Sequence, residues 1–428
     1  MKRVALHTLG CKLNYAETSA IGERFRANGF DLTELGQDSD VVLINSCSVT
    51  ENADRECRQL VRRALRKNPD ACVIVTGCYA QLKPEEIASI EGVDYVLGSS
   101  EKFRIFDLVD SFSKLDTPQV AVGEIAHETG FGPAFSAEAD SRTRAFLKVQ
   151  DGCDYNCSFC TIPLARGGSR SQPEEDVIRQ ATELVQRGYQ EIVLTGVNTG
   201  DYGKRDGGSL YDLLCRLHDV EGIHRLRISS IEPNLLTDSV IELAASSDRM
   251  MPHFHVPLQS GSDMILGKMR RRYRSGDYRD RVEKIIAAMP DAGIGVDVIV
   301  GFPGEGEEEF GTTYDFLHAL PVAYFHVFTY SERQNTPARD FENPVPVGRR
   351  RERTRMLRSL SEKKRRAFAE EYIGSVRPVL LEAERADGIV QGYTDNYIRI
   401  SVPGGTGERI VDVKLREWDG EVVRGEIV

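Results

Sequence analysis

Short apolar runs alternate with amphipathic segments over the first 112 residues of this chain. Runs of strand type cover 4–9, 41–45, 72–76 and 95–97, and segments of helical periodicity cover 15–27, 51–67, 84–90 and 102–112. Alternating strands and helices predict a doubly wound parallel sheet with helices on its faces. We therefore expect an α/β domain over residues 1–112.

Six further strand candidates follow a polar stretch at about 113–142, which predicts a connection between domains. Helical patterns such as 173–187 and 210–220 separate them. The strand candidates cover 145–149, 191–195, 225–229, 253–256, 296–300 and 324–328. This pattern predicts a second domain of six β/α repeats over residues 139–370.

The last part of the chain, 371–428, changes to short β-type runs. They cover 376–381, 389–393, 397–402, 410–415 and 422–428. Five short strands predict a small OB-like barrel, a fold often used for RNA. This segment holds eleven acidic and seven basic residues, so its charge alone does not indicate an RNA clamp.

Composition narrows the class of protein. The net charge is −11, and no apolar run approaches the ~20 residues that a membrane span needs. The start of the chain has no apolar signal-peptide core. Nine cysteines, an odd number in 428 residues, argue against a secreted disulfide framework, so we expect a cytoplasmic protein.

Three cysteines, Cys153, Cys157 and Cys160, have the spacing Cys-x₃-Cys-x₂-Cys. A tetrahedral zinc site needs four ligands, whereas three thiolates can hold three irons of a 4Fe–4S cluster and leave the fourth iron open. With Phe159 before the last cysteine, the run resembles the signature of radical S-adenosylmethionine (SAM) enzymes. That resemblance implies SAM at the open iron. A zinc knuckle without its fourth ligand and three unconnected cysteines are the alternatives.

Three other cysteines, Cys11, Cys47 and Cys78, each follow a predicted strand by one or two residues. The carboxyl ends of strands in such a sheet share one edge, so these thiols could converge on a second cluster. Cys57, Cys72 and Cys215 fit packing roles or no role.

Residues 8–14 (TLGCKLN), 45–50 (NSCSVT) and 76–80 (TGCYA) resemble the three cluster motifs of the methylthiotransferase N-terminal domain. That family joins this domain to a radical SAM core, an open partial (β/α)6 barrel, and to a C-terminal TRAM domain. The resemblance covers essentially the whole chain. It implies two 4Fe–4S clusters, SAM as methyl donor and radical source, no protein nucleophile, and conversion of C–H to C–S–CH₃.

Polar and glycine-containing segments follow four successive strands of the second domain. By resemblance to radical SAM proteins they would contact SAM. The residues expected in these segments are Gly196, Asn198, Ser229, Glu232, Gln259, Val300 and Gly301. Phe159 in the cysteine run would also contact SAM, and Arg166 and Arg170 after it would hold the SAM carboxylate or the substrate.

Basic segments predict contact with a phosphate backbone, although each could also be a solvated helix face. Two such segments cover 268–274 and 349–366. A third group of cations follows Cys47, between positions 55 and 67. The residues expected to bind RNA are Lys268, Arg270, Arg271, Arg272, Arg349, Arg350 and Arg351.

Residues 8–15 and 162–167 most resemble the branch that acts on N6-threonylcarbamoyladenosine beside the tRNA anticodon; Lys12 and Leu13 fit neither other branch. Those branches act on isopentenyladenosine in tRNA and on a ribosomal-protein aspartate. A non-catalytic iron–sulfur redox carrier is a further alternative. The expected partners are tRNA, an electron donor such as a flavodoxin or ferredoxin, and a sulfur source, with no membrane.

Overall fold

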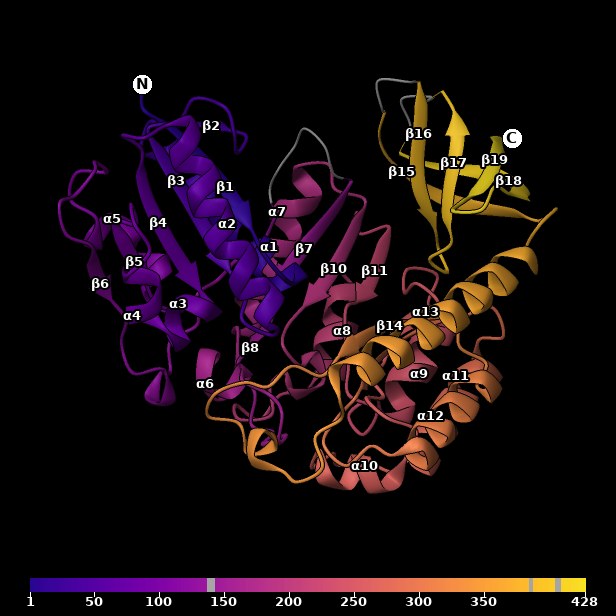
Figure 1. The fold of residues 1–428 in the computed structure, drawn as a ribbon. Coiled ribbons are helices and arrows are strands. Elements are labelled where there is room, and N and C mark those ends of the chain that lie inside the picture. Colours follow the sequence, from indigo (N-terminus) through magenta and orange to yellow (C-terminus); the bar gives the residue numbers. More distant parts are fainter. Residues whose placement is uncertain (137–142, 385–387, 405–408) are drawn as a thin grey trace.

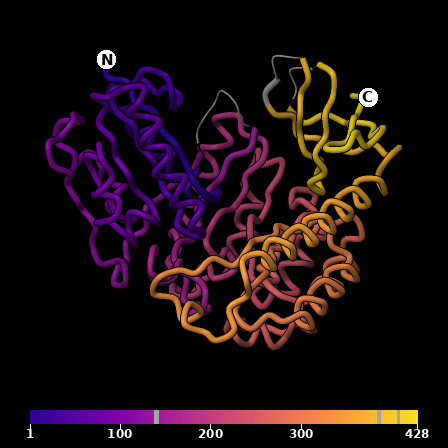
Figure 2. The backbone as a smooth tube through the Cα atoms, in the orientation of Figure 1, coloured from indigo at the N-terminus to yellow at the C-terminus, as the bar shows by residue number. Residues whose placement is uncertain are grey.

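The computed structural model describes residues 1–136, 143–384, 388–404 and 409–428. It consists of a parallel sheet with helices, an open barrel and a small closed barrel (Figure 1). The chain passes through them in that order, from indigo at the N-terminus to yellow at the C-terminus (Figure 2). The predicted α/β class and the three architectures are confirmed. The predicted domain start at residue 139 lies outside the described residues.

The N-terminal sheet is parallel and has the strand order β2-β1-β3-β4-β5-β6. Its central strands β3 and β4 are buried along their whole length because helices cover both faces. Helices α1 and α5 pack on one face, and α2, α3 and α4 pack on the other. The elements are β1 (Arg3–Thr8), α1 (Lys12–Ala27), β2 (Asp31–Thr33), β3 (Val41–Ser46), α2 (Glu51–Lys67), β4 (Cys72–Gly77), α3 (Cys78–Leu82), α4 (Pro84–Ala88), β5 (Tyr95–Leu97), α5 (Ile105–Leu108) and β6 (Gln119–Ala121).

The sheet extends beyond the predicted boundary at residue 112. Strand β6 lies in the stretch expected to be a connection, and it pairs with β5. Strand β6 lies at the edge of the sheet and is largely exposed, so it lacks the buried apolar run that marks the equally short β5.

The central domain is a partial barrel made of two parallel three-stranded sheets. A bridge between Leu226 and Met250 and a 3.0 Å hydrogen bond from Ile231 N–H to the carbonyl of His255 connect the sheets. All six predicted strands are present. They are β7 (Arg144–Lys148), β10 (Glu191–Thr195), β11 (Arg225–Ile228), β12 (His253–His255), β13 (Gly293–Val300) and β14 (Tyr324–Thr329).

Helices cover the outside of this barrel, with α13 running diagonally to the C-terminal domain (Figure 1). Val296, Val298 and Val300 of β13 belong to the hydrophobic core beneath these helices. Alternation along the strand turns Asp297 and Ile299 to the barrel interior. The helices are α7 (Glu174–Gln186), α8 (Leu210–His218), α9 (Asp238–Ser246), α10 (Asp263–Lys268), α11 (Ser275–Ala288), α12 (Glu307–Ala319) and α13 (Val347–Glu370).

The C-terminal domain is a closed barrel of five strands in the order β15-β16-β17-β19-β18. It docks where the strands of the central barrel begin: Arg225 donates to the carbonyl of Pro378 at 2.8 Å, and Tyr397 stacks on His253 with ring centroids 4.2 Å apart. Its strands are β15 (Val376–Glu384), β16 (Ile389–Thr394), β17 (Arg399–Pro403), β18 (Ile410–Trp418) and β19 (Val423–Ile427).

Helix α1 lies between the N-terminal sheet and the central barrel. Tyr15 of α1 meets Phe146 of β7 edge to face, with centroids 5.7 Å apart, and Ala16 shares a small core with Phe146 and Val193. The start of α1 is therefore held against the barrel. Among the described residues, no helix combines the length and apolar character needed to span a membrane.

Candidate functional site

Cys11, Cys47 and Cys78 follow three neighbouring strands of the N-terminal sheet. Cys11 precedes α1, Cys47 follows β3 directly, and Cys78 begins α3 after β4. Because β1, β3 and β4 are adjacent and parallel, these positions share one edge of the sheet. Cys78 and Cys11 both act electrostatically on Cys47 and raise its pKa, so the three thiols lie within range of one another.

Two glycines let the three loops approach one another. A Cβ on Gly10 would lie 2.8 Å from the Sγ of Cys47, and a Cβ on Gly77 would lie 2.4 Å from the carbonyl oxygen of Ser46. Both glycines have positive φ angles, 96° and 94°. Any larger residue at either position would push the loops apart.

Two thiols of this first triad, Cys47 and Cys11, have raised pKa values in the protein alone. Burial, followed by the nearby Cys78 and Cys11, raises the pKa of Cys47 to about 12. The surrounding protein also raises the pKa of Cys11, although the positive charge of Arg166 acts in the opposite direction. Thiolate ligation therefore requires a metal that displaces these protons.

Cys153, Cys157 and Cys160 lie in a loop between β8 (Gln150–Asp151) and α6 (Ile162–Arg166). Burial raises the pKa of Cys153 and of Cys160 to about 12. The Nη1 of Arg271 lies 3.3 Å from the Sγ of Cys157, and Tyr155 N–H donates to the Sγ of Cys153 at 3.4 Å. N–H donors of this kind stabilise the negative charge of sulfur ligands in iron–sulfur clusters.

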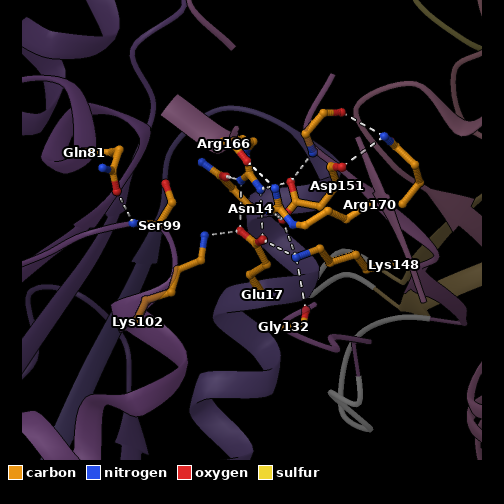
Figure 3. Close-up of polar contacts among 12 residues, drawn as sticks. Asn14, Glu17, Gln81, Ser99, Lys102, Gly132, Lys148, Asp151, Arg166 and Arg170 are labelled. Carbon is orange, nitrogen blue, oxygen red and sulfur yellow. Dashed lines mark hydrogen bonds and ion pairs between the residues drawn. The ribbon is translucent and has the colours of Figure 1, made fainter. Parts of the chain in front are cut away.

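A buried ion network joins the two cysteine triads (Figure 3). Glu17 of α1 accepts hydrogen bonds from Lys102 at 2.6 Å, Lys148 at 2.9 Å and Arg166 at 2.9 Å. Asp151 pairs with Arg166 at 2.9 Å and with Lys148 at 2.7 Å. All five side chains are buried.

The network fixes the spacing of the triads because its members flank both. Glu17 lies on the helix that follows Cys11, while Asp151 and Arg166 bracket the Cys153–Cys160 loop. With Arg170, which lies 3.6 Å from Asp151, four cations face two carboxylates, and Arg166 lowers the pKa of Cys11. The surplus positive charge therefore lies close to the first triad, where it suits a cluster bearing thiolates.

The sequence did not point to Glu17, Lys102 or Lys148, although a signal was present. Leu13, Glu17 and Ile21 follow one another at helical spacing, so an acid occupies the apolar face of α1. A buried charge at such a position needs a partner, which only the fold could identify.

Arg166 and Arg170, both predicted to hold SAM or the substrate, already have partners within the protein, and their contact with a ligand stays a prediction. The guanidinium of Arg166 makes four hydrogen bonds, all to Glu17, Asp151 and Asn14. Arg170 donates to the backbone carbonyls of Gly130, Arg166 and Gly168. Both side chains are thus engaged in holding loops together.

Asn198 has the clearest unmet hydrogen-bonding capacity among the residues predicted to contact SAM. Its N–H donates to the Oε1 of Gln150 at 2.8 Å, and its Nδ2 donates to Asp201 at 2.9 Å. Its Oδ1 is buried and has no partner among the described residues. A buried acceptor of this kind is costly unless a ligand or water donates to it. Gly196 also lies against Gln150, since a Cβ there would lie 2.8 Å from the same Oε1.

The other predicted SAM residues lie at the ends of barrel strands or in the cysteine loop. Glu232 pairs with Arg271 and so reaches the second triad, while Phe159 meets Phe302 edge to face at 6.4 Å. Gly301 has a φ of 79°, and a Cβ there would lie 2.4 Å from the Cγ of Arg350. Ser229 and Val300 are buried, and Gln259 is half-buried. Their contact with SAM stays a prediction.

Two of the residues predicted to bind RNA are in the interior. Arg271 is 4% exposed and pairs with Glu232, and Arg350 donates to the carbonyls of Val345 at 2.6 Å and Tyr330 at 3.2 Å. The sequence shows two runs of cations, but it does not show which of their side chains the fold directs inward. The exposed members are Lys268, Arg270, Arg272, Arg349 and Arg351.

Each triad fits a 4Fe–4S cluster with one open iron. Three thiols, close-packed glycines, N–H donors and nearby cations are the groups that such a cluster requires. Cys57 and Cys72 are fully buried in the hydrophobic cores, as predicted, and offer no fourth ligand.

Three family models match successive parts of the chain. They are the Uncharacterized protein family UPF0004 at residues 3–98, the Radical SAM superfamily at 147–317 and the TRAM domain at 370–428. Their order is the one expected from the resemblance, so the predicted domain types are confirmed.

Curated relatives match over nearly the full length. The chain is 42% identical over 427 residues to the threonylcarbamoyladenosine tRNA methylthiotransferase MtaB of Bacillus subtilis (strain 168), covering 97% of this chain and 94% of the relative. The protein of the same name from Aquifex aeolicus (strain VF5) is 39% identical over 94% of this chain and 97% of its own. A tRNA-2-methylthio-N(6)-dimethylallyladenosine synthase of Methylobacillus flagellatus is 32% identical, covering 100% and 99%.

Solved structures of lower identity share the fold. The radical SAM methyltransferase TsrM from Kitasatospora setae, with cobalamin and a 4Fe-4S cluster bound, matches with a TM-score of 0.53 at 15% identity over 91% of this chain and 80% of that chain. Identity over nearly the full length and the three domains in order show that the chain belongs to the radical SAM methylthiotransferase family.

Proposed function

We propose that this protein adds a methylthio group to carbon 2 of N6-threonylcarbamoyladenosine beside the anticodon of tRNA. The structural observation that carries the proposal is the pair of three-thiol sites joined through one buried ion network. The choice of nucleoside follows the names of the relatives at 42% and 39% identity.

Each thiol set would hold one cluster. Cys153, Cys157 and Cys160 would hold the SAM-binding cluster, and Cys11, Cys47 and Cys78 the auxiliary cluster. When bound, the two clusters and SAM supply the radical and sulfur-transfer chemistry.

The chain's own residues would position these groups. The Oδ1 of Asn198 would accept a hydrogen bond from SAM, since it is buried without a partner among the described residues. Arg271 would balance charge beside Cys157 while Glu232 keeps the guanidinium in place. The buried Glu17 network would keep the separation of the triads constant.

Transfer RNA would lie across exposed cations. Arg270 and Arg272 are exposed on either side of Arg271, which contacts Cys157, and Arg272 also stacks on Tyr155 at 3.8 Å. On the N-terminal domain, a groove of about 1410 Å³ between α2 and α4 is lined by cations that include Arg62, Arg63 and Arg66. Phosphate contacts at these positions would make binding depend on salt.

The reaction also needs partners that bind elsewhere. We expect a flavodoxin or ferredoxin to supply electrons and a sulfur source to renew the donated sulfur. The cytoplasm, where tRNA is modified, is the expected location.

Nucleoside mass spectrometry tests the proposal. Reconstituted protein, SAM and a reductant are incubated with tRNA that carries N6-threonylcarbamoyladenosine, and the expected product is its 2-methylthio derivative. A matched tRNA that carries isopentenyladenosine should stay unmodified. Modification of the second tRNA alone would refute the proposed substrate, and product formation by the Cys153→Ala/Cys157→Ala/Cys160→Ala variant would refute the proposed chemistry.

A further inference from the structure

The interior of the central barrel contains a polar cluster that neither triad uses. His255, Asp297 and His326 come from the adjacent strands β12, β13 and β14, and one polar atom of each lies within 4.8 Å of the others. The Nε2 of His255 is 3.0 Å from the Oδ1 of Asp297. His326 is exposed, so solvent reaches this part of the interior.

These three side chains face the interior because their neighbours occupy the core. Phe325 and Val327 are buried beneath the outer helices, so alternation along β14 turns His326 to the other side. The same alternation places Asp297 opposite Val296 and Val298. The cluster is therefore built by regular strands and does not depend on a loop.

Lys12 brings a free positive charge to the same interior. It is the first residue of α1, directly after Cys11, and it is exposed. Within the described part of the chain it forms no hydrogen bond and no ion pair. Burial lowers the pKa of His326 and Asp297 opposes it, while His255, Arg365 and, least of all, Lys12 add smaller lowering effects. Lys12 also acts on Tyr397. Ala16, one turn further along the same face of α1, packs against Phe146 of β7 and Val193 of β10, so this face of the helix directs Lys12 toward the barrel, beside a thiol of the first triad.

We infer that Lys12, His255 and His326 form a carboxylate-binding site that recognises the threonyl group of the substrate. The inference rests on the proposed function, because an N6-threonylcarbamoyl group carries a free carboxylate and a hydroxyl. Lys12 and the His326 imidazole would face the carboxylate. Asp297 holds His255 and can accept a hydrogen bond from the substrate hydroxyl.

The same interior disfavours an apolar substituent. An isopentenyl group would cover Lys12, Asp297 and two imidazoles without offering them hydrogen bonds, and burying unpaired polar groups is costly. A carboxylate replaces the lost water contacts with charge-assisted hydrogen bonds. The site therefore explains selection between the two modified adenosines.

Anticodon stem-loop RNAs that differ by one charge test the inference. One RNA carries N6-threonylcarbamoyladenosine and the other carries its methyl ester, and binding is measured by fluorescence anisotropy alongside methylthiolation. Wild-type protein should prefer the acid by roughly 10- to 100-fold, the range of a hydrogen bond to a charged group. Lys12→Gln should remove most of this preference, and Lys12→Arg should retain it.

Two further variants make the test specific. His326→Gln, which lies far from Cys11 in the sequence, should also reduce the preference for the acid. Lys284→Gln is the control, because it removes a charge from α11, where Lys284 pairs with Asp238. It can change the total affinity for RNA but not the ratio of the affinities for acid and ester. Equal iron content after reconstitution shows that the Cys11 loop is intact.

The outcomes separate the two proposals. If wild-type protein modifies the acid but Lys12→Gln and His326→Gln keep its full preference, the carboxylate site is wrong and the proposed function stands. If wild-type protein treats acid and ester alike, the carboxylate site is also wrong. If it modifies neither RNA, both proposals fail.

Discussion

Among single residues, Glu17 has the most demanding environment. It is fully buried and surrounded by Lys102, Lys148 and Arg166. Glu17→Gln would leave three buried cations with only Asp151 between them, and breaking a buried pair in this way costs about 3–5 kcal/mol. We expect the free energy of unfolding, measured by urea denaturation and circular dichroism, to fall by that amount. Glu23→Gln, on the same helix but with a side chain 36% exposed, should cost less than about 1 kcal/mol. Equal losses would contradict the role of the network.

The buried carboxylate of Glu17 should also make the stability of the protein depend on pH. Burial tends to raise the pKa of Glu17, but Arg166, Lys102 and Lys148 together lower it well below 4.5. A carboxylate with a depressed pKa stabilises the fold above its unfolded pKa, and this contribution is lost as the pH falls further. The stability difference between wild type and Glu17→Gln should therefore be constant from about pH 6 to 8 and narrow below about pH 4.5. A difference that widens in acid would refute this assignment.

At the scale of elements, the turn between α10 and α11 divides neighbouring arginines into two roles. Arg270 and Arg272 are exposed, whereas Arg271 is buried beside Cys157. Arg270→Gln/Arg272→Gln should weaken tRNA binding and reduce the log–log salt slope by roughly one unit per lost phosphate contact. Arg271→Gln should instead reduce SAM cleavage measured without RNA.

A matched control on the following helix tests whether position matters. Arg281 of α11 pairs with Asp238 on α9, away from the second triad. Arg281→Gln removes the same charge and should leave the salt slope unchanged. If it lowers the slope as much as Arg270→Gln/Arg272→Gln, the RNA path does not follow this turn.

At the scale of the whole molecule, the two domains should divide the chemistry. Cys11, Cys47 and Cys78 belong to the N-terminal sheet, and the other triad belongs to the barrel. Cys11→Ala/Cys47→Ala/Cys78→Ala should bind about four irons instead of about eight, cleave SAM, and insert no sulfur. Iron analysis and detection of 5′-deoxyadenosine provide the measurements. Loss of SAM cleavage in a folded variant that retains four irons would argue against the division.

The degree to which the sequence predicted the structure differs between features. The six barrel strands, the spacing of Cys153, Cys157 and Cys160, and the position of each other triad cysteine just after a strand follow from local patterns, because each pattern involves residues that are close in sequence. The edge strands β2 and β6 were missed because they are short and partly exposed, and so carry no apolar run. Arg271 and Arg350 were assigned to RNA because a run of cations does not reveal which side chains point inward.

The sequence by itself determined which thiols are available, the order of the three domains and the family. The tertiary structure decided how these parts meet. Glu17 and Arg166 are 149 positions apart, yet they form one buried pair that links the triads. His255, Asp297 and His326 likewise come together only because three parallel strands place them on one side. Contacts of this kind depend on strand order and domain docking, and no local pattern of residues encodes them.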